Sequence, residues 1–261
     1  MTKRARTAIF ILFVFLFILG APSVVFYSQG YRVDFNPPAG GKKLVQTGGL
    51  YFKVAPDHVD VYINGKLKKG TSIITNAAYI ENLLPKNYDI EIKKVGYHPW
   101  KKTLEVKERG VTEAKNIILF PENPQFVIAD KAPPKITNSA TSTDKRKKAY
   151  SNEYEISVAF LEKNTPVDKQ DKRIFLTRFS EKIGSIFWLN DHYLIFNIGN
   201  KIKISEIDDR DGLNIIDLAE FSAQGGSASG GEKLKIIWDK DAKKLYVLSE
   251  GNTYLLENLL P

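Results

Sequence analysis

The segment VDVYINGK, residues 59–66, decides the fold class of the middle of this chain. Its apolar residues Val59, Val61 and Ile63 occupy every second position, which is the period of a strand with one buried face. The pair Asn64-Gly65 follows at once and favours a type I′ hairpin, because both central residues of that turn need a positive φ. The segment therefore predicts a strand, a tight turn and a returning strand.

The same alternation continues on both sides of this hairpin, across residues 44–120. Residues 49–54, 88–92, 104–106 and 117–119 have the composition of further short strands, and no stretch between them sustains a 3.6-residue period. Several short strands separated by turn signals are typical of a compact β-sandwich. We therefore expect an all-β domain over residues 44–120.

Two parts of this region contain short motifs that occur together in one known family. The motifs are Gly49-Leu50-Tyr51, Ala55-Pro56 and Val59–Lys66 in the first part, and Leu84-Pro85, Tyr88-Asp89-Ile90, Lys94–Tyr97 and Trp100 in the second. With them the region resembles the PEGA domain family over about 75 of the 261 residues. The family's usual Glu-Gly-Ala is replaced by Asp57-His58-Val59, and Lys86 stands at its usual turn glycine. The resemblance implies a non-catalytic surface module that serves display or binding.

The aromatic cluster Tyr97, His98 and Trp100 admits two interpretations. Aromatic faces can stack on sugar rings, so the cluster could be a carbohydrate platform. The favoured interpretation is that Tyr97 and Trp100 close the core of the sandwich. His58 is interpreted as a turn residue, because nothing near it in the sequence completes a metal site.

Residues 1–31 have the composition of a membrane anchor. Lys3, Arg4 and Arg6 precede a segment without charge that lasts until Arg32, and residues 8–26 are almost all apolar. About 20 apolar residues suffice to cross a bilayer as a helix. The basic cluster is expected to stay cytoplasmic, which places the bulk of the chain outside the cytoplasm at the cell membrane.

A cleaved signal peptide, processed near Gly20-Ala21, is the alternative. It is disfavoured because apolar residues resume after Pro22 and no clean Ala-x-Ala site occurs. The prediction is a single-pass, uncleaved transmembrane helix.

Residues 121–143 are rich in proline and then in serine and threonine, which is typical of an extended linker at a domain boundary. Residues 144–261 then contain a repeat, whose tryptophans Trp188 and Trp238 are fifty positions apart. Each of these copies contains a hairpin pair, Gly199-Asn200 or Gly251-Asn252. A weaker copy begins at residue 144, so three β repeats are expected.

The tryptophan-to-hairpin pattern resembles blades of a TolB-type β-propeller over about 120 residues. Three copies are fewer than the four to eight blades that close a propeller. We therefore expect an incomplete ring, which is either an open arc or a unit that a partner chain or a second copy completes.

Three polar segments of the repeat region invite functional interpretations. Residues 208–214 suggest a calcium loop, but an EF-hand register would place Ile207 and Leu218 at ligand positions, so a polar turn is favoured. Residues 222–231 resemble a phosphate loop only in composition. The basic run 145–148 is interpreted as a solvated turn, ahead of attraction to anionic envelope polymers and of nucleic-acid binding.

Composition narrows the function classes further. The net charge is +8. The chain has no cysteine, so disulfides, cysteine zinc sites and thiol nucleophiles are excluded. No hydrolase motif is present, so no catalytic, cofactor-binding or metal-ligating residue is assigned. The sequence predicts a non-enzymatic, membrane-anchored envelope protein that binds wall glycans or envelope proteins and no nucleic acid. The alternatives are an envelope hydrolase, with paired acids, and a sensor component. The histidines are His58, His98 and His192.

Overall fold

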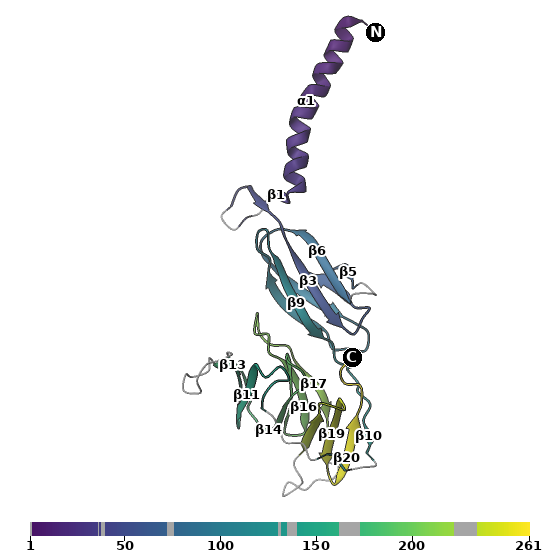
Figure 1. Ribbon diagram of the computed structural model, residues 1–261, viewed down its shortest axis with the longest axis vertical. Coiled ribbons are helices and arrows are strands. Elements are labelled where there is room, and N and C mark those ends of the chain that lie inside the picture. The colour runs from purple at the N-terminus through teal and green to yellow at the C-terminus, as the bar shows by residue number, and fades with distance from the viewer. Residues whose placement is uncertain are drawn as a thin grey trace.

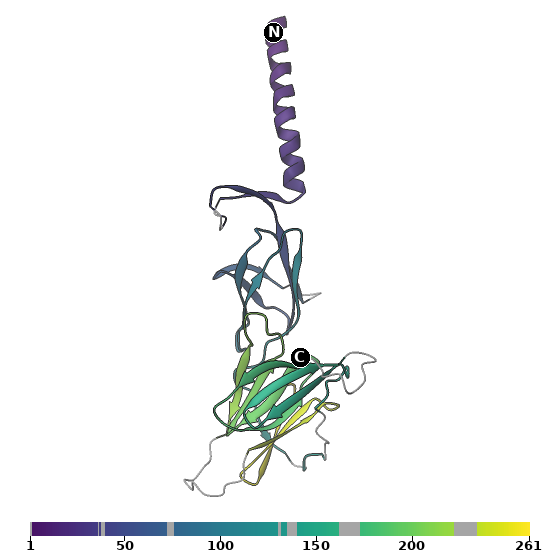
Figure 2. The ribbon, with the colours of Figure 1, turned by 90° about the vertical axis from the view of Figure 1, so that its left-hand side faces the viewer.

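An apolar helix leads into six β-sheets in the computed structural model (Figures 1 and 2). The structure describes residues 2–35, 37, 40–71, 76–129, 132–134, 140–161, 173–221 and 234–261. The helix, a sandwich of two sheets and a second group of three sheets follow one another along the long axis of the molecule (Figure 1). The prediction of a mostly β chain with one N-terminal helix is confirmed.

Helix α1 spans Lys3–Ser28, and none of its residues is buried. It begins at Thr2, whose Oγ1 accepts a hydrogen bond from the Ala5 N–H at 3.3 Å. At 1.5 Å per residue its 26 residues extend about 39 Å, more than the roughly 30 Å of bilayer hydrocarbon. The helix is therefore long and apolar enough to cross a membrane, a property that signal sequences near an N-terminus share.

A small hairpin joins the helix to the sandwich. Strand β1 (Tyr31–Asp34) pairs antiparallel with β2 (Lys43–Gln46). At its base, Thr47 donates to the Gly30 carbonyl oxygen through its N–H at 2.8 Å and its Oγ1 at 3.0 Å. Arg32 bonds to the Tyr27 carbonyl at the end of the helix and to Asn82 Oδ1 of the sandwich, both at 2.9 Å. Helix, hairpin and sandwich are thus tied together at one point.

The sandwich module, residues 48–118, consists of a three-stranded sheet facing a four-stranded one. Strands β3 and β9 pair in parallel, and every other pair is antiparallel. The sheet orders are β6-β3-β9 and β5-β4-β7-β8. The strands are β3 (Gly48–Ala55), β4 (Asp60–Ile63), β5 (Lys66–Gly70), β6 (Ala77–Leu83), β7 (Asn87–Lys93), β8 (Trp100–Glu105) and β9 (Val111–Ile118).

The core of the sandwich module follows the predicted alternation. Leu50 and Phe52 of β3 and Ile92 of β7 are fully buried in one cluster with residues of the opposite sheet. The hairpin between β4 and β5 is confirmed, because Asn64 (φ 48°) and Gly65 (φ 74°) both have a positive φ. Val61 and Ile63 thus lie on the buried face of β4, and Val59, which is also buried, directly precedes the strand.

The second module, residues 127–256, has three sheets, which we call the first, middle and third sheets in chain order. The first sheet contains β11 (Lys147–Asn152), β12 (Glu155–Phe160) and β13 (Arg173–Arg178). The middle sheet contains β14 (Ile183–Trp188), β15 (Tyr193–Ile198), β16 (Lys201–Glu206) and β17 (Ile215–Glu220). The third sheet contains β18 (Lys235–Asp239), β19 (Lys244–Ser249), β20 (Asn252–Leu256) and β10 (Val127–Ile128).

The middle sheet is buried on both faces. All six residues of β15 are buried, and they alternate between two cores. Leu194 and Phe196 pack in the core that includes Ile156 of the first sheet, whereas Ile195 packs with Val247 of the third. The three repeats therefore lie side by side as layers, and no closed ring or barrel is present in the part of the chain that the structure describes.

Within the segment 121–143, expected as an extended linker, Val127 pairs with Leu255 and gives the third sheet its fourth strand. The turn between β19 and β20 lies one residue earlier than Gly251-Asn252: Glu250 (φ 50°) and Gly251 (φ 75°) form it, and Asn252 begins the strand. The turn at Gly199-Asn200 is confirmed.

Candidate functional site

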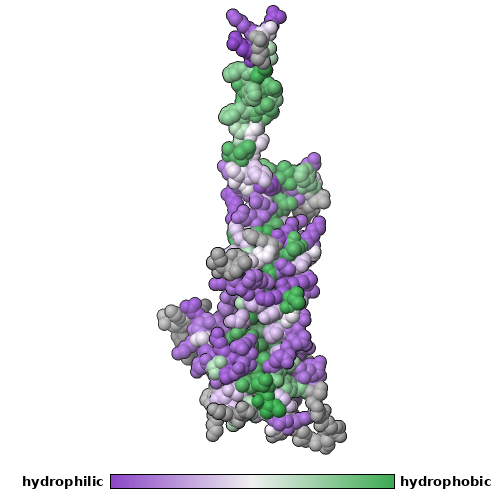
Figure 3. Space-filling view, turned by 90° about the vertical axis from the view of Figure 1, so that its right-hand side faces the viewer, coloured by the Kyte–Doolittle hydropathy of each residue, from purple (hydrophilic) through white to green (hydrophobic). Residues whose placement is uncertain are grey.

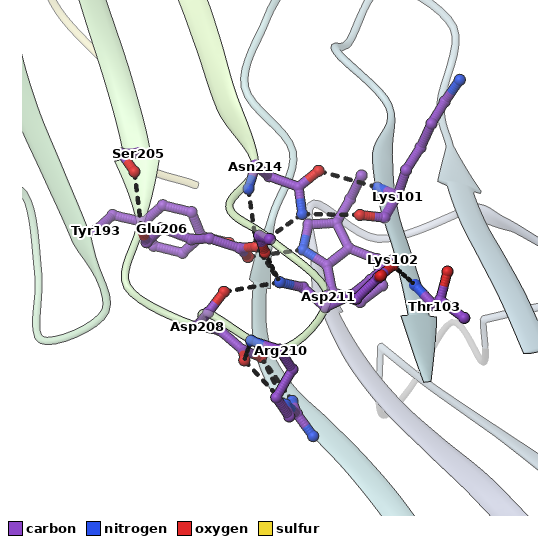
Figure 4. Close-up of polar contacts among 12 residues, drawn as sticks. Lys101, Lys102, Thr103, Tyr193, Ser205, Glu206, Asp208, Arg210, Asp211 and Asn214 are labelled. Carbon is purple, nitrogen blue, oxygen red and sulfur yellow. Dashed lines mark hydrogen bonds and ion pairs between the residues drawn. The ribbon is translucent and has the colours of Figure 1, made fainter. Parts of the chain in front are cut away.

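The two modules meet where strand β8 of the sandwich faces the loop 207–214 between β16 and β17 (Figure 4). The centre of this contact is an ion pair between Lys102 Nζ and Glu206 Oε1 at 2.6 Å. The Lys102 side chain has no exposed surface and that of Glu206 has 5%. A buried ion pair requires further hydrogen bonds to offset the loss of water around both charges.

The loop supplies those bonds to the lysine. The carbonyl oxygens of Asp208 and Gly212 accept from Lys102 Nζ at 2.7 and 2.8 Å, so the ammonium has three oxygen partners. The sequence suggested a polar turn here, with a calcium loop as the alternative. The loop does enclose a cation, but that cation is the ammonium of Lys102, delivered by the sandwich module.

The carboxylate of Glu206 is equally well satisfied. The indole N–H of Trp100 donates to its Oε2 at 2.9 Å, and Asn214 donates to its Oε1 from the backbone N–H (3.1 Å) and from Nδ2 (2.7 Å). Trp100 is 3% exposed and belongs to the sandwich core. The favoured interpretation of Trp100 as a core residue is therefore confirmed, and its polar edge also binds the second module.

Backbone bonds hold the same loop against β8. Lys101 and Asn214 exchange two bonds: the Lys101 N–H donates to Asn214 Oδ1 at 3.1 Å, and Asn214 Nδ2 donates to the Lys101 carbonyl at 3.0 Å. The Thr103 N–H donates to Asp211 Oδ2 at 2.6 Å. Hydrogen bonding from the Thr103 side chain and then from this N–H lowers the pKa of Asp211. The loop thus satisfies backbone groups at the outer edge of the sheet, where β8 is the last strand.

A cleft of about 510 Å³ opens beside this contact. Five consecutive residues of β9, 113–117, form one wall. Side chains of a strand alternate between two faces, so five consecutive residues can line one cavity only along the edge of the strand. We call this cavity the interdomain cleft; its other lining residues are Trp100, Lys147, Phe160, His192, Tyr193, Glu206, Ile207, Asp208, Asp209 and Arg210.

Two bonds from the second module close parts of the β9 edge. The Tyr193 hydroxyl accepts from the Ile118 N–H at 3.0 Å, and Arg210 donates to the Glu113 carbonyl at 3.2 Å. Burial raises the pKa of Tyr193, and the nearby charge of Glu206 raises it further, so the phenol stays neutral. Between these two hydrogen bonds the β3–β9 register shifts, so two residues of β9, Lys115 and Asn116, lie opposite the single residue Lys53 of β3. This β-bulge lies in the part of β9 that lines the cleft.

The rim of the cleft carries charges of both signs. Lys147 is 9% exposed and pairs with Asp144 at 3.0 Å. Burial alone would raise the pKa of Asp144, but hydrogen bonds from Ser142 and the Arg146 N–H, together with Lys147, lower it overall. The Lys147 ammonium at the cleft is therefore matched by a carboxylate that stays ionised.

Among the lining side chains, those of His192 and Phe160 offer contacts to a ligand. The imidazole of His192 makes no hydrogen bond within the described residues, and its pKa is lowered by burial and by the charge of Lys147. It is therefore neutral at pH 7, with one donor and one acceptor nitrogen. Phe160, at the end of β12, is 42% exposed and offers an apolar surface. The cleft can accordingly hold a ligand that combines hydrogen-bonding groups with an apolar part.

The other residues singled out from the sequence lie apart from this cleft or do not form one site. Tyr97 packs on the sandwich core, and His98 is half-buried, with its Nε2 unpartnered; no open aromatic platform forms with Trp100. His58 lies in a turn with φ 54° and pairs with Asp57 at 3.1 Å. In the described ranges, no three His, Asp or Glu side chains gather as metal ligands.

The basic run 145–148 does not form one patch. The side chain of Lys147 lies at the cleft, whereas the ammonium of Lys148 lies 5.1 Å from the centre of the Tyr150 ring. Residues 222–231, with their phosphate-loop composition, lie outside the described residues.

Sequence reasoning missed Lys102, Glu206 and His192 as site residues. Lys102 and Glu206 belong to ordinary alternating strands, in which a charged residue is expected to face solvent. The pair Lys101-Lys102 does not itself indicate which lysine faces inward. The one signal in the sequence is the two-residue spacing: Lys102 shares a face of β8 with Trp100 and Leu104, which are apolar.

Comparison with known proteins identifies no family for this chain. No family model matches it, and no curated protein matches it. The crystal structure of a DUF3823 family protein from Bacteroides ovatus is similar over 66% of this chain and 100% of its own, with 11% identity and a TM-score of 0.22.

Proposed function

We propose that this chain is a non-enzymatic, membrane-anchored protein of the cell envelope that binds a ligand in the interdomain cleft. In this proposal α1 is an uncleaved anchor, and both β modules lie outside the cytoplasm. The sandwich module serves as a PEGA-like spacer, and the second module, whose repeats resemble TolB-type blades, completes the binding site.

One observation carries this proposal: the cleft is built from both modules, and the buried contact of Lys102 with Glu206 fixes the two walls relative to each other. Ligand sites occur preferentially at such domain interfaces. The apolar and exposed helix supports placement at a membrane. A wall glycan or an envelope protein would each provide hydrogen-bonding groups for His192 and an apolar surface for Phe160.

Photocrosslinking in living cells tests the binding site. We would replace Phe160 by p-benzoylphenylalanine in the full chain, irradiate intact cells and analyse the adducts by mass. Phe175 is a matched control, because it is also an exposed phenylalanine of the first sheet, at 59%, and does not line the cleft. Adducts at position 160 and not at position 175 are expected, and their mass identifies glycan or protein. Equal labelling at both positions would contradict a ligand site in the cleft.

Membrane association is tested separately. The full chain should remain in the membrane pellet after alkaline carbonate extraction, at its uncleaved mass, and externally added protease should remove the β modules. Release of the chain, a shortened N-terminus or protection from protease would each contradict the anchored topology.

A further inference from the structure

The hairpin β1–β2, next to the end of α1, has an apolar face without a partner in the described residues. Val33, Phe35 and Leu44 are 44%, 67% and 55% exposed. Val33 and Leu44 are direct cross-strand partners and share one face, and Phe35 follows directly after the end of β1 at Asp34. On the other face, Val45 is only 4% exposed. The hairpin is thus amphipathic, with its apolar face turned outward.

Its position next to the helix is fixed by several contacts. Strand β1 begins at Tyr31, three residues after α1 ends at Ser28. The rings of Phe26 and Tyr31 meet edge to face at 5.4 Å, and both donors of Thr47 bind the Gly30 carbonyl. Apolar atoms gather beside the base of the helix at this level (Figure 3). The apolar face of the hairpin therefore lies level with the C-terminal end of α1, where the helix would leave the hydrocarbon of a membrane.

The charges of the hairpin are mostly basic and suit an anionic surface. Arg32, Lys42 and Lys43 stand against one acid, Asp34. The Lys42 ammonium lies 5.3 Å from the centre of the Phe35 ring, so a basic group borders the apolar face. Basic residues beside exposed aromatic and aliphatic side chains are typical of elements that lie in the headgroup region of anionic bilayers.

We propose that hairpin β1–β2 lies in the membrane interface, with Val33, Phe35 and Leu44 in contact with acyl chains and Lys42 on anionic lipid headgroups. This rests on the proposed membrane anchoring. A helix alone leaves the tilt of the modules against the bilayer unrestrained, whereas a second contact beside it restrains that tilt. The partner is a lipid surface, because the apolar face continues directly from the membrane-spanning element.

Site-specific fluorescence on the full chain tests the proposal, and the absence of native cysteine makes single labelling clean. Leu44→Cys, labelled with the fluorophore NBD, is reconstituted at one chain per nanodisc of phosphatidylcholine with phosphatidylglycerol. Leu67→Cys is the matched control, since Leu67 is also an exposed leucine of a strand, at 57%, on the sandwich module away from the helix. A blue-shifted emission that doxyl-labelled lipid quenches is expected at position 44 and not at position 67.

The charge contribution is measured in the same assay. The variant Lys42→Gln should lose part of the blue shift at position 44, and nanodiscs of phosphatidylcholine alone should also reduce it. Indistinguishable emission at positions 44 and 67 would overturn the proposal. A blue shift without lipid quenching would also overturn it, because the face would then be covered by protein.

A third label separates this proposal from membrane anchoring. Val14→Cys places NBD in the middle of α1, where quenching by doxyl lipid reports insertion of the helix. Without quenching at position 14, the anchoring itself fails. Quenching at position 14 without quenching at position 44 overturns the hairpin contact alone.

Discussion

At the scale of single residues, Lys102 controls how the two modules are held together. Its side chain is fully buried, and its ammonium binds Glu206 and two carbonyl groups of the loop 207–214. Removing one partner of a buried ion pair leaves the other charge without water or counter-charge. That asymmetry makes the residue costly to replace, whatever the pair itself contributes.

Lys102→Met is expected to lower the free energy of unfolding by about 3–5 kcal/mol, because Glu206 stays buried without its cation. Lys101→Met is the matched control: its ammonium pairs with Glu91 at 3.0 Å, but its side chain is 64% exposed, so a loss of about 0.2–1 kcal/mol is expected. Thermal and denaturant unfolding of the detergent-solubilised chain measures both. Equal losses would show that the buried pair does not stabilise the interface.

His192 is expected to make stability depend on pH. Burial and the charge of Lys147 lower its pKa, against the opposing effect of Asp191, Asp144 and Asp208. The unfolded chain therefore takes up the proton first as the pH falls below about 6.5. The contribution of His192 is present above that pH and is lost as the pH falls through the lower pKa of the folded state.

The measurement is the unfolding midpoint at pH 7.5 and at pH 5. His192→Gln should reduce the difference between the two. The acids with lowered pKa, Asp144 and Asp208, lose their stabilising charge only at more acidic pH, so they do not obscure the comparison. An unchanged difference in the variant would exclude His192 as the cause.

At the scale of elements, β15 is the strand on which the second module depends. It is buried on both faces because the first and third sheets cover it. A strand of this kind has a continuous apolar run, and Tyr193–Ile198 shows one apart from Asn197. Asn197 is compatible with that position because it donates to the Leu234 carbonyl at 2.9 Å and accepts from the Ser185 N–H at 2.8 Å.

Phe196→Ala in β15 is expected to cost about 3–5 kcal/mol, because it leaves a cavity between the first and middle sheets. Phe175→Ala removes the same side chain from the exposed face of β13 and should stay within about 0.5 kcal/mol. Denaturant unfolding followed by tryptophan fluorescence compares them, since Trp188 belongs to the same core as Phe196. Similar losses would contradict the stacking of these two sheets.

The elements themselves were largely predictable, because strands and tight turns have local causes. The Asn64-Gly65 turn follows from two residues that adopt a positive φ, and the Gly199-Asn200 turn from a glycine that adopts it at the first position. The turn at Glu250-Gly251 was missed by one residue because glutamate has no such preference, so the sequence favoured asparagine instead. Strand β10 was missed because two residues between prolines carry no periodic signal of their own.

At the scale of the whole molecule, the sequence could not predict the contact between the modules. Trp100 and Glu206 are 106 positions apart, and nothing in either strand signals the other. The loop 207–214 has the composition of a solvated turn, and its partner is a backbone edge, which leaves no mark in side-chain composition. The candidate cleft is a product of that contact, so it too becomes visible only in three dimensions.

The course of β9 determines how far the cleft stands from the lipid. Its start adjoins Thr47, which binds the end of α1 at Gly30, and its last residue, Ile118, binds Tyr193 of the second module. The lining residues 113–117 lie two to six residues beyond Val111, where β9 begins, so at about 3.3 Å per residue the cleft extends from about 7 to about 20 Å along the strand. An anchored chain would therefore present the cleft alongside the sandwich module, with the end at residue 113 nearer to the lipid than the end at residue 117.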